Sequence, residues 1–186
     1  MIVMTIRLIF LASLFLLSLN GFSTKYITKT GYAYFKSHTD AIDIDGSNRN
    51  VAAIIDPATG EIVVIVLIKA FDLPLATAKE HFNETYMESD KFPKATFKGK
   101  LTDLTGKTLA VDGEYPVTAE GTLTIHGQSR EIKQKATMKV KNGEVSGSCK
   151  FQVNINDYGI VVPSDVKNRV AQVVDVVVEF SVKPQE

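Results

Sequence analysis

The 186-residue sequence contains one cysteine, Cys149, and no tryptophan. One cysteine excludes an intrachain disulfide, so at this length a hydrophobic core must hold the fold together. Neither sign of charge is in excess, because 21 basic residues are balanced by 21 acidic ones. This balance gives no electrostatic basis for binding nucleic acid, and we expect no such partner.

Motifs for metal binding and catalysis are also missing. The three histidines, His38, His81 and His126, are scattered without the spacing of a metal site. No nucleophile elbow, phosphate-binding loop or paired-cysteine motif occurs. Cys149 falls on the apolar face of a predicted strand, which indicates a buried, inert thiol rather than a nucleophile. We therefore expect a protein without enzymatic activity, metal or cofactor.

The longest uncharged apolar stretch, residues 8–19, is shorter than the ~20 residues that span a bilayer. It follows Arg7 and precedes Gly21-Phe22-Ser23, which places small residues at the −3 and −1 positions of a cleavage site. Residues 1–23 are therefore predicted to be a signal peptide cut after Ser23. The mature domain would then be residues 24–186, periplasmic or secreted, without stable membrane insertion; an uncleaved anchor is the alternative.

Strand patterns dominate the rest of the chain. Alternating or continuous apolar residues predict about eight strands, and an Asn142-Gly143 hairpin joins two of them. The predicted strands cover residues 26–35, 51–55, 61–70, 95–101, 119–125, 132–140, 145–153 and 174–182. Residues 43–50 and 56–60 are predicted to be turn-rich connections, and residues 127–129 another turn. Most strands have one apolar and one polar face, which favours an antiparallel barrel or sandwich.

One helix is predicted before Pro93. Thr77 and Glu80 have the spacing of a capping box, and Ala78, Phe82 and Tyr86 form an apolar stripe. Such a stripe could cover a sheet or the mouth of a barrel. A single helical turn is also predicted over residues 164–170, with Ser164 as its cap.

Three short segments in the second half of the sequence are the basis of a family resemblance. They are residues 87–97, MESDKFPKATF, residues 121–127, GTLTIHG, and residues 157–160, DYGI. In order, they are similar to the patterns S-D-x-(F/Y)-P-x-(A/I)-x-F, G-x-L-T-(I/L)-(R/H)-G and D-(F/Y)-G-(I/M) of the YceI-like family of secreted bacterial proteins. The segments occur in the family's order, whereas the first half of the chain departs from its pattern.

The resemblance implies an all-β fold, an eight-stranded antiparallel lipocalin-like β-barrel with one inserted α-helix. It further implies an apolar tunnel that takes a polyprenyl or acyl chain. A barrel of eight strands is just wide enough to be filled by side chains or to hold one small ligand.

The inward-facing residues are therefore the candidate ligand contacts, although the same residues could simply fill the core. Inward glycines and alanines, such as Gly99, Gly147 and Ala95, favour a cavity because they leave room. Gln134 lies in phase with inward Ile132 and Ala136, and a buried amide needs a hydrogen-bond partner. The candidates, together with two residues of the helix, are Phe35, Val64, Val66, Phe82, Tyr86, Phe97, Leu123, Gln134, Met138, Phe151, Val176 and Phe180.

We expect a periplasmic or secreted binding protein that sequesters or carries an amphiphilic lipid of the isoprenoid or fatty-acyl type. One alternative is a filled barrel that acts as an interaction module, with Lys133, Lys135, Lys139 and Lys141 as its contact surface. Another is a hydrolase or electron-transfer accessory that uses His81 or His126 with a nearby carboxylate. The sequence leaves homodimer formation open.

Overall fold

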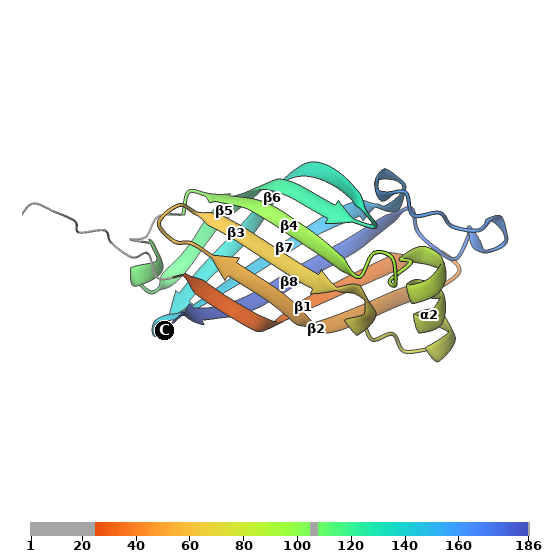
Figure 1. Cartoon of the computed structure of the whole chain (residues 1–186), viewed down its shortest axis with the longest axis horizontal. Helices are drawn as coiled ribbons and strands as arrows, with labels where there is room; N and C mark the ends of the chain where they lie inside the picture. The colour runs from red at the N-terminus through yellow and green to blue at the C-terminus, as the bar shows by residue number, and fades with distance from the viewer. Residues whose placement is uncertain (1–24, 105–107, 186) are drawn as a thin grey trace, which may run out of the picture.

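The computed structural model describes residues 25–104 and 108–185, and these residues form a closed barrel of eight antiparallel strands (Figure 1). Each strand pairs with its neighbours in the sequence, and β1 also pairs with β8. The strands are β1 (Tyr26–His38), β2 (Asp43–Ile55), β3 (Glu61–Leu67), β4 (Lys94–Thr102), β5 (Gly113–Ile125), β6 (Gln128–Lys141), β7 (Glu144–Asn154) and β8 (Val173–Pro184). The predicted fold class is confirmed, while the predicted signal peptide lies outside the described residues.

The two ends of the barrel are built differently. One end carries the short helix α2 (Ala76–His81), the π-helical turn η2 (Phe82–Tyr86) and the long β7–β8 connection (Figure 1). We call this the α2 end. The opposite end carries the 3-10 turn η3 (Thr108–Ala110), the start of β1 and the end of β8 (Figure 1).

Side chains fill the barrel at the η3 end. Ile55, Val145 and Val182 are completely shielded from solvent there, and Leu104 and Leu109 are buried in the same cluster. Along β6 and β7 the inward residues alternate with polar residues on the outer face, as expected for a sheet with one wet face, whereas β3 is apolar on both faces. Among the described residues, the filled end is therefore the η3 end, and the α2 end is the one left for a ligand to enter.

Residues 43–50 were predicted to be a connection, and this prediction is wrong because they form the first half of β2. Gly46 lies under the ring of Phe35, where a Cβ atom would come within 2.5 Å of a ring carbon. Asn48 is buried, and its amide donates to the carbonyl of Leu67 at the end of β3 (2.7 Å). Gly46 and Asn48, which are typical of turns, are therefore explained here by close packing and by a hydrogen bond within a strand.

The predicted capping box is also wrong. The N-cap of α2 is Leu75, and no side chain caps the helix. The β3–β4 connection contains the 3-10 turn η1 (Ile68–Ala70), then α2 and η2, and Lys94 starts β4 directly after Pro93. None of the helices in the described residues is long and apolar enough to cross a bilayer.

Smaller differences occur in the other connections. The β5–β6 turn is at His126-Gly127, both with positive φ, so that β6 already begins at Gln128. The β7–β8 connection contains two 3-10 turns, η4 (Ile155–Tyr158) and η5 (Ser164–Val166). Pro163, and not Ser164, is the N-cap of η5. The Asn142-Gly143 turn is confirmed, with φ of 52° and 77°.

Three of the small inward residues, Ala95, Ala136 and Gly147, line a cavity inside the barrel, as predicted. Gly99 does not line it. A Cβ atom on Gly99 would lie 2.8 Å from the ring of Phe97, and one on Gly147 would lie 2.5 Å from the ring of Phe180. An aromatic ring of the barrel therefore takes the space directly beside each of these two glycines.

Candidate binding cavity

Two adjoining cavities occupy the barrel between the filled end and the α2 end. The inner cavity has a volume of about 90 Å³ and the outer one about 500 Å³. Both are lined by Val66, Ala95, Leu123, Phe151 and Val178, which surround the place where they meet. The outer volume lies within the range of about 300–1,000 Å³ that is typical of small-molecule sites.

The outer cavity opens to solvent at the α2 end. Its rim includes Ile42 of the β1–β2 connection and Leu75 before α2, which are 43% and 61% exposed. Further inside, the lining is mostly aliphatic and aromatic, with Ala33 and Val176 from the barrel wall and Ala78 from α2. An apolar molecule could therefore enter between the α2 segment, by which we mean residues 76–92, and the β7–β8 connection.

Three phenylalanine rings attach the α2 segment to the barrel. Phe82 stacks on Phe35 of β1 with ring centroids 5.2 Å apart, and Phe71 meets both rings edge-on at 5.4 and 5.5 Å. Aromatic pairs of this geometry contribute about 0.5–1.5 kcal/mol each beyond their burial. They form one wall of the outer cavity.

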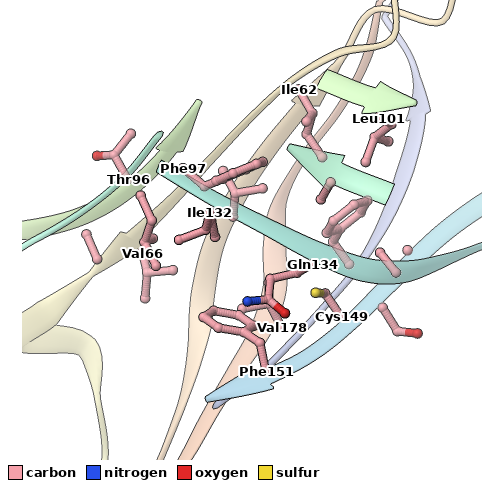
Figure 2. A pocket seen from close by; sticks show the side chains of 18 of the residues that line it. Ile62, Val66, Thr96, Phe97, Leu101, Ile132, Gln134, Cys149, Phe151 and Val178 are labelled. Atoms are coloured by element: carbon pink, nitrogen blue, oxygen red, sulfur yellow. The ribbon is translucent and has the colours of Figure 1, made fainter. Parts of the chain in front are cut away.

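The inner cavity is almost entirely apolar (Figure 2). Gln134 of β6 extends its amide into the space that Phe151 and Cys149 also face (Figure 2). The Cys149 thiol donates to the carbonyl of Lys135 (3.4 Å), and burial raises the pKa of this thiol. This environment is consistent with the prediction of an inert thiol, because a raised pKa keeps the thiol protonated. Among the described residues no charged side chain lines the inner cavity.

All twelve residues that were predicted from the sequence to contact a ligand line one or both cavities. The inner cavity alone is lined by Val64, Phe97, Gln134, Met138 and Phe180, and the outer alone by Phe35, Phe82, Tyr86 and Val176. Both cavities are lined by Val66, Leu123 and Phe151. Their role in binding stays a prediction.

Sequence reasoning missed the part of the lining that comes from connections. Ile68, Phe71 and Leu73 line the outer cavity from the β3–β4 connection, and Ile160 and Val170 from the β7–β8 connection. Ile68 continues the alternation of Ile62, Val64 and Val66 but was not chosen as a candidate. Phe71, Leu73 and Ile160 lie outside the predicted strands and helices, where periodicity gives no orientation. Their one visible signal is a group of large apolar residues beside Pro74 and Pro163, where loops are usually polar.

The three histidines lie apart. His38 contacts Asp43, His81 is exposed on the rim of the outer cavity, and His126 lies in the β5–β6 turn. Although His126 lies in a turn, its side chain is only 10% exposed. Its Nε2 lies 2.7 Å from Glu88 of the α2 segment and its Nδ1 lies 3.2 Å from the carbonyl of Tyr158.

Both ring nitrogens of His126 have partners within the protein. Phe92 packs edge-on against the imidazole at 4.5 Å. His126 therefore connects the α2 segment, the β5–β6 turn and η4. In the described residues no three His, Cys, Asp or Glu side chains gather closely enough to hold a metal ion.

Charged groups are confined to the rim of the outer cavity and the outer surface of the barrel. At the rim, a hydrogen bond from Lys36 (2.7 Å) lowers the pKa of Asp43. Arg169 also lines the rim, and its guanidinium has no ion-pair partner within the described residues. On the outer surface, Lys133 pairs with Glu120 (3.0 Å) and Lys139 with Glu114 (2.8 Å). Of the four lysines considered as a contact surface, Lys133 and Lys139 thus form ion pairs with the neighbouring strand.

A closed eight-stranded antiparallel barrel with an apolar cavity that opens at one end defines a lipocalin-like fold. The family model of the YceI-like domain matches residues 24–182, which is most of the chain. The chain therefore belongs to the YceI-like family, as the three sequence segments indicated. No curated protein matches it significantly.

Solved structures of distant relatives have the same fold. A polyisoprenoid-binding domain from Saccharophagus degradans, implicated in plant cell wall breakdown, is 12% identical, with a TM-score of 0.75 over 87% of this chain and 99% of that one. BcnA from Burkholderia cenocepacia is 18% identical, with a TM-score of 0.65 over 82% and 95%. A YceI protein from Campylobacter jejuni is 19% identical, with a TM-score of 0.58 over 76% and 85%.

Proposed function

We propose that this protein binds an amphiphilic lipid of the isoprenoid or fatty-acyl type and carries it through the periplasm. The observation that carries the proposal is the outer cavity of about 500 Å³, apolar inside and open at one end, which continues into the inner cavity. The similarity to a polyisoprenoid-binding domain supports the same class of ligand. The signal-like residues 1–23 support delivery to the periplasm.

Burial of a hydrocarbon chain supplies the driving force for binding in this proposal. Each methylene removed from water contributes about 0.8 kcal/mol, so ten of them contribute about 8 kcal/mol. This is comparable with the association cost of roughly 4–15 kcal/mol. Affinity should therefore rise with chain length until the two cavities are full, and no catalytic group is needed.

The test is mass spectrometry of organic extracts from the natively purified protein, followed by titration with a fluorescent acyl chain and a fluorescent prenyl chain. We expect a co-purified long-chain amphiphile and saturable binding of at least one of the two probes. A protein that carries no lipid and binds neither probe would contradict the proposal.

A substitution at the entrance locates the binding to the cavity. Ala78 on α2 lines the outer cavity, and Ala78→Trp would fill its entrance. We expect probe affinity to fall at least about tenfold, because an indole takes space that several methylenes would otherwise occupy. Glu80→Trp is the matched control, since Glu80 is exposed on the same helix outside the cavity lining. Equal affinities of the two variants would place the probe elsewhere.

A further inference from the structure

The outer face of β3 is apolar, although the side of a barrel wall that faces water is expected to be polar. Ile62, Val64 and Val66 line the inner cavity, so the alternate residues of the strand point outward. By strand register, these outward residues of β3 lie beside outward apolar residues of β2 and β1. Together they form one surface, which we call the β3 face, made of Ile27, Ala52, Ile54, Val63, Ile65 and Leu67.

The β3 face is open to solvent within the described part of the chain. Leu67 is 48% exposed and Ile54 is 39% exposed, and the other four side chains are partly exposed. In Figure 1, where β3 lies between β2 and β4, the helices are at the ends of the barrel and not over this face. A continuous apolar surface that extends over three strands indicates an interaction site.

A row of lysines borders the β3 face. Lys94, Lys98 and Lys100 lie on the outer face of β4, directly beside outward residues of β3 in the strand register. All three are exposed and have no ion-pair partner among the described residues, although Glu61 lies opposite Lys100. The β3 face is therefore an apolar surface with net positive charge along one side.

This composition fits a lipid surface better than a protein partner. Protein interfaces are enriched in aromatic residues and arginine and depleted in lysine, whereas the β3 face is aliphatic and its border consists of lysines. An anionic bilayer complements both parts of the surface. Aliphatic side chains enter the boundary between head groups and acyl chains, and lysines attract the anionic head groups.

We propose that the β3 face docks the protein on the surface of an anionic lipid bilayer. The face ends with Leu67, at the α2 end of the barrel, so a docked protein holds the opening of its outer cavity close to the bilayer. A lipid tail can then pass between bilayer and cavity with little exposure to water. The purpose of the docking rests on the proposed function, to which it adds the surface from which the ligand is collected.

The experiment is co-sedimentation of the natively purified protein with vesicles of two compositions. One vesicle contains phosphatidylglycerol and phosphatidylethanolamine, and the other contains phosphatidylcholine alone. We expect tighter binding to the anionic vesicles, and loss of this preference in about 1 M salt, where charges are screened within about 3 Å. A protein that sediments with neither vesicle overturns the docking surface.

Two substitutions test the two parts of the surface. Lys98→Glu should weaken binding to the anionic vesicles at least about tenfold, because each positive charge near such a surface contributes about fivefold and the substitution reverses one. Leu67→Thr should weaken binding about fivefold, because it removes an exposed apolar side chain and keeps a residue suited to a strand.

Matched controls lie elsewhere on the barrel. Lys135→Glu makes the same charge change at an exposed position of β6, and Val111→Thr removes a side chain that is 61% exposed near the η3 end. Both variants should bind vesicles as the wild type does. Equal losses in Lys98→Glu and Lys135→Glu would mean that overall charge, and not the β3 face, determines the binding, which overturns the proposal.

The remaining outcomes separate docking from ligand binding. Leu67 and Lys98 line neither cavity, so both variants should bind a soluble fluorescent acyl probe as the wild type does, which also shows that they are folded. A wild-type protein that binds the probe but no vesicles overturns the docking surface alone, and one that binds vesicles but no probe overturns the proposed function alone. A dimer in sedimentation velocity that Leu67→Thr dissociates would show that a second copy covers the β3 face, and would overturn the lipid surface as its partner.

Discussion

At the scale of single residues, the barrel wall depends on glycines where two backbones come close. A Cβ atom on Gly99 would lie 2.3 Å from the carbonyl oxygen of Glu120 on β5, and one on Gly121 would lie 2.3 Å from that of Lys98 on β4. Real Cβ atoms do not approach that closely, so any side chain here must push the two strands apart. The close approach of β4 and β5 therefore requires glycine on both strands.

This packing predicts the effect of Gly99→Ala. The added methyl group meets backbone on one side and the Phe97 ring on the other, and neither can move cheaply. We expect the free energy of unfolding to fall by about 1–3 kcal/mol, as for overpacked cores, measured by urea denaturation. Lys98→Ala, at an exposed neighbouring position, should stay within about 0.5 kcal/mol of the wild type. Equal stability of the two variants would contradict the packing described.

Cys149 makes a second residue-scale prediction, which concerns pH. Burial raises the pKa of its thiol in the folded protein, whereas the unfolded chain has the ordinary value near 9. As pH rises through that value, the unfolded chain loses its proton and the folded protein keeps it. The folded state then binds more protons, so the free energy of unfolding must decrease with rising pH.

The measurement is urea denaturation of the wild type and Cys149→Ala from about pH 7 to about pH 10. The wild type should lose more stability over this range than the variant does. Tyr86 and Tyr158, whose pKa values are also raised by burial, are present in both proteins and cancel in the comparison. Parallel pH profiles would show that the thiol is not desolvated in the folded state.

Residue patterns in the sequence identified which residues face into the barrel, but not how their side chains pack there. Alternation was sufficient to place Phe97, Gln134 and Met138 inside the barrel. It could not show that the Phe97 ring covers Gly99, because ring position depends on side-chain rotamers and on the neighbouring strand. For the same reason, the sequence could not show that, of the small inward residues, Ala95, Ala136 and Gly147 line the inner cavity and Gly99 does not.

At the scale of elements, the α2 segment owes its position to contacts beyond its own helix. The helix α2 has six residues and no side-chain cap, which is too short to be stable alone. The phenylalanine rings hold one side of the segment, and the contact of His126 with Glu88 holds the other. The failed capping box illustrates the same point, since tertiary contacts and not local helix signals decide where this helix begins.

The contact between His126 and Glu88 predicts a local change in mobility. His126→Asn removes the imidazole and keeps a residue that tolerates the positive φ of 50°. We expect a loss of about 1–3 kcal/mol in stability, and faster amide hydrogen exchange at Met87 and Ser89, whose amides bond within the segment. Unchanged exchange at these two amides would show that His126 does not hold the segment.

The matched control lies in the same segment. Asp90→Asn breaks the ion pair of Asp90 with Lys69, in which the two side chains are 92% and 60% exposed. Exposed pairs contribute little, so stability and amide exchange should stay near those of the wild type. The contrast between the two variants isolates the effect of burial on an otherwise similar polar contact.

At the scale of the whole molecule, the barrel is divided into a filled half and a hollow half. Ile55, Val145 and Val182 supply the tightly packed core at the η3 end, so that the α2 end can stay hollow. Such a division lets the barrel hold a cavity of about 500 Å³ without a disulfide. The number of strands and the fold could be predicted from the sequence. The boundary between the filled and the hollow half could not, because it depends on how side chains from several strands pack together.

This division predicts that the length of the bound chain can be changed from the inner cavity alone. Ala136→Leu adds three carbon atoms beside Gln134 and fills part of the volume of about 90 Å³. In a series of saturated acyl chains, affinity should stop rising a few methylenes earlier than in the wild type, each lost contact weakening binding by about 0.8 kcal/mol. Chains short enough to occupy only the outer cavity should bind both proteins equally. Thr137→Leu is the control, because Thr137 is the next residue of β6 and is exposed; the affinities for all chain lengths should stay unchanged.

A uniform loss of affinity at every chain length in Ala136→Leu would contradict the prediction. It would mean that the substitution distorts the barrel, and that the longest chains do not end in the inner cavity.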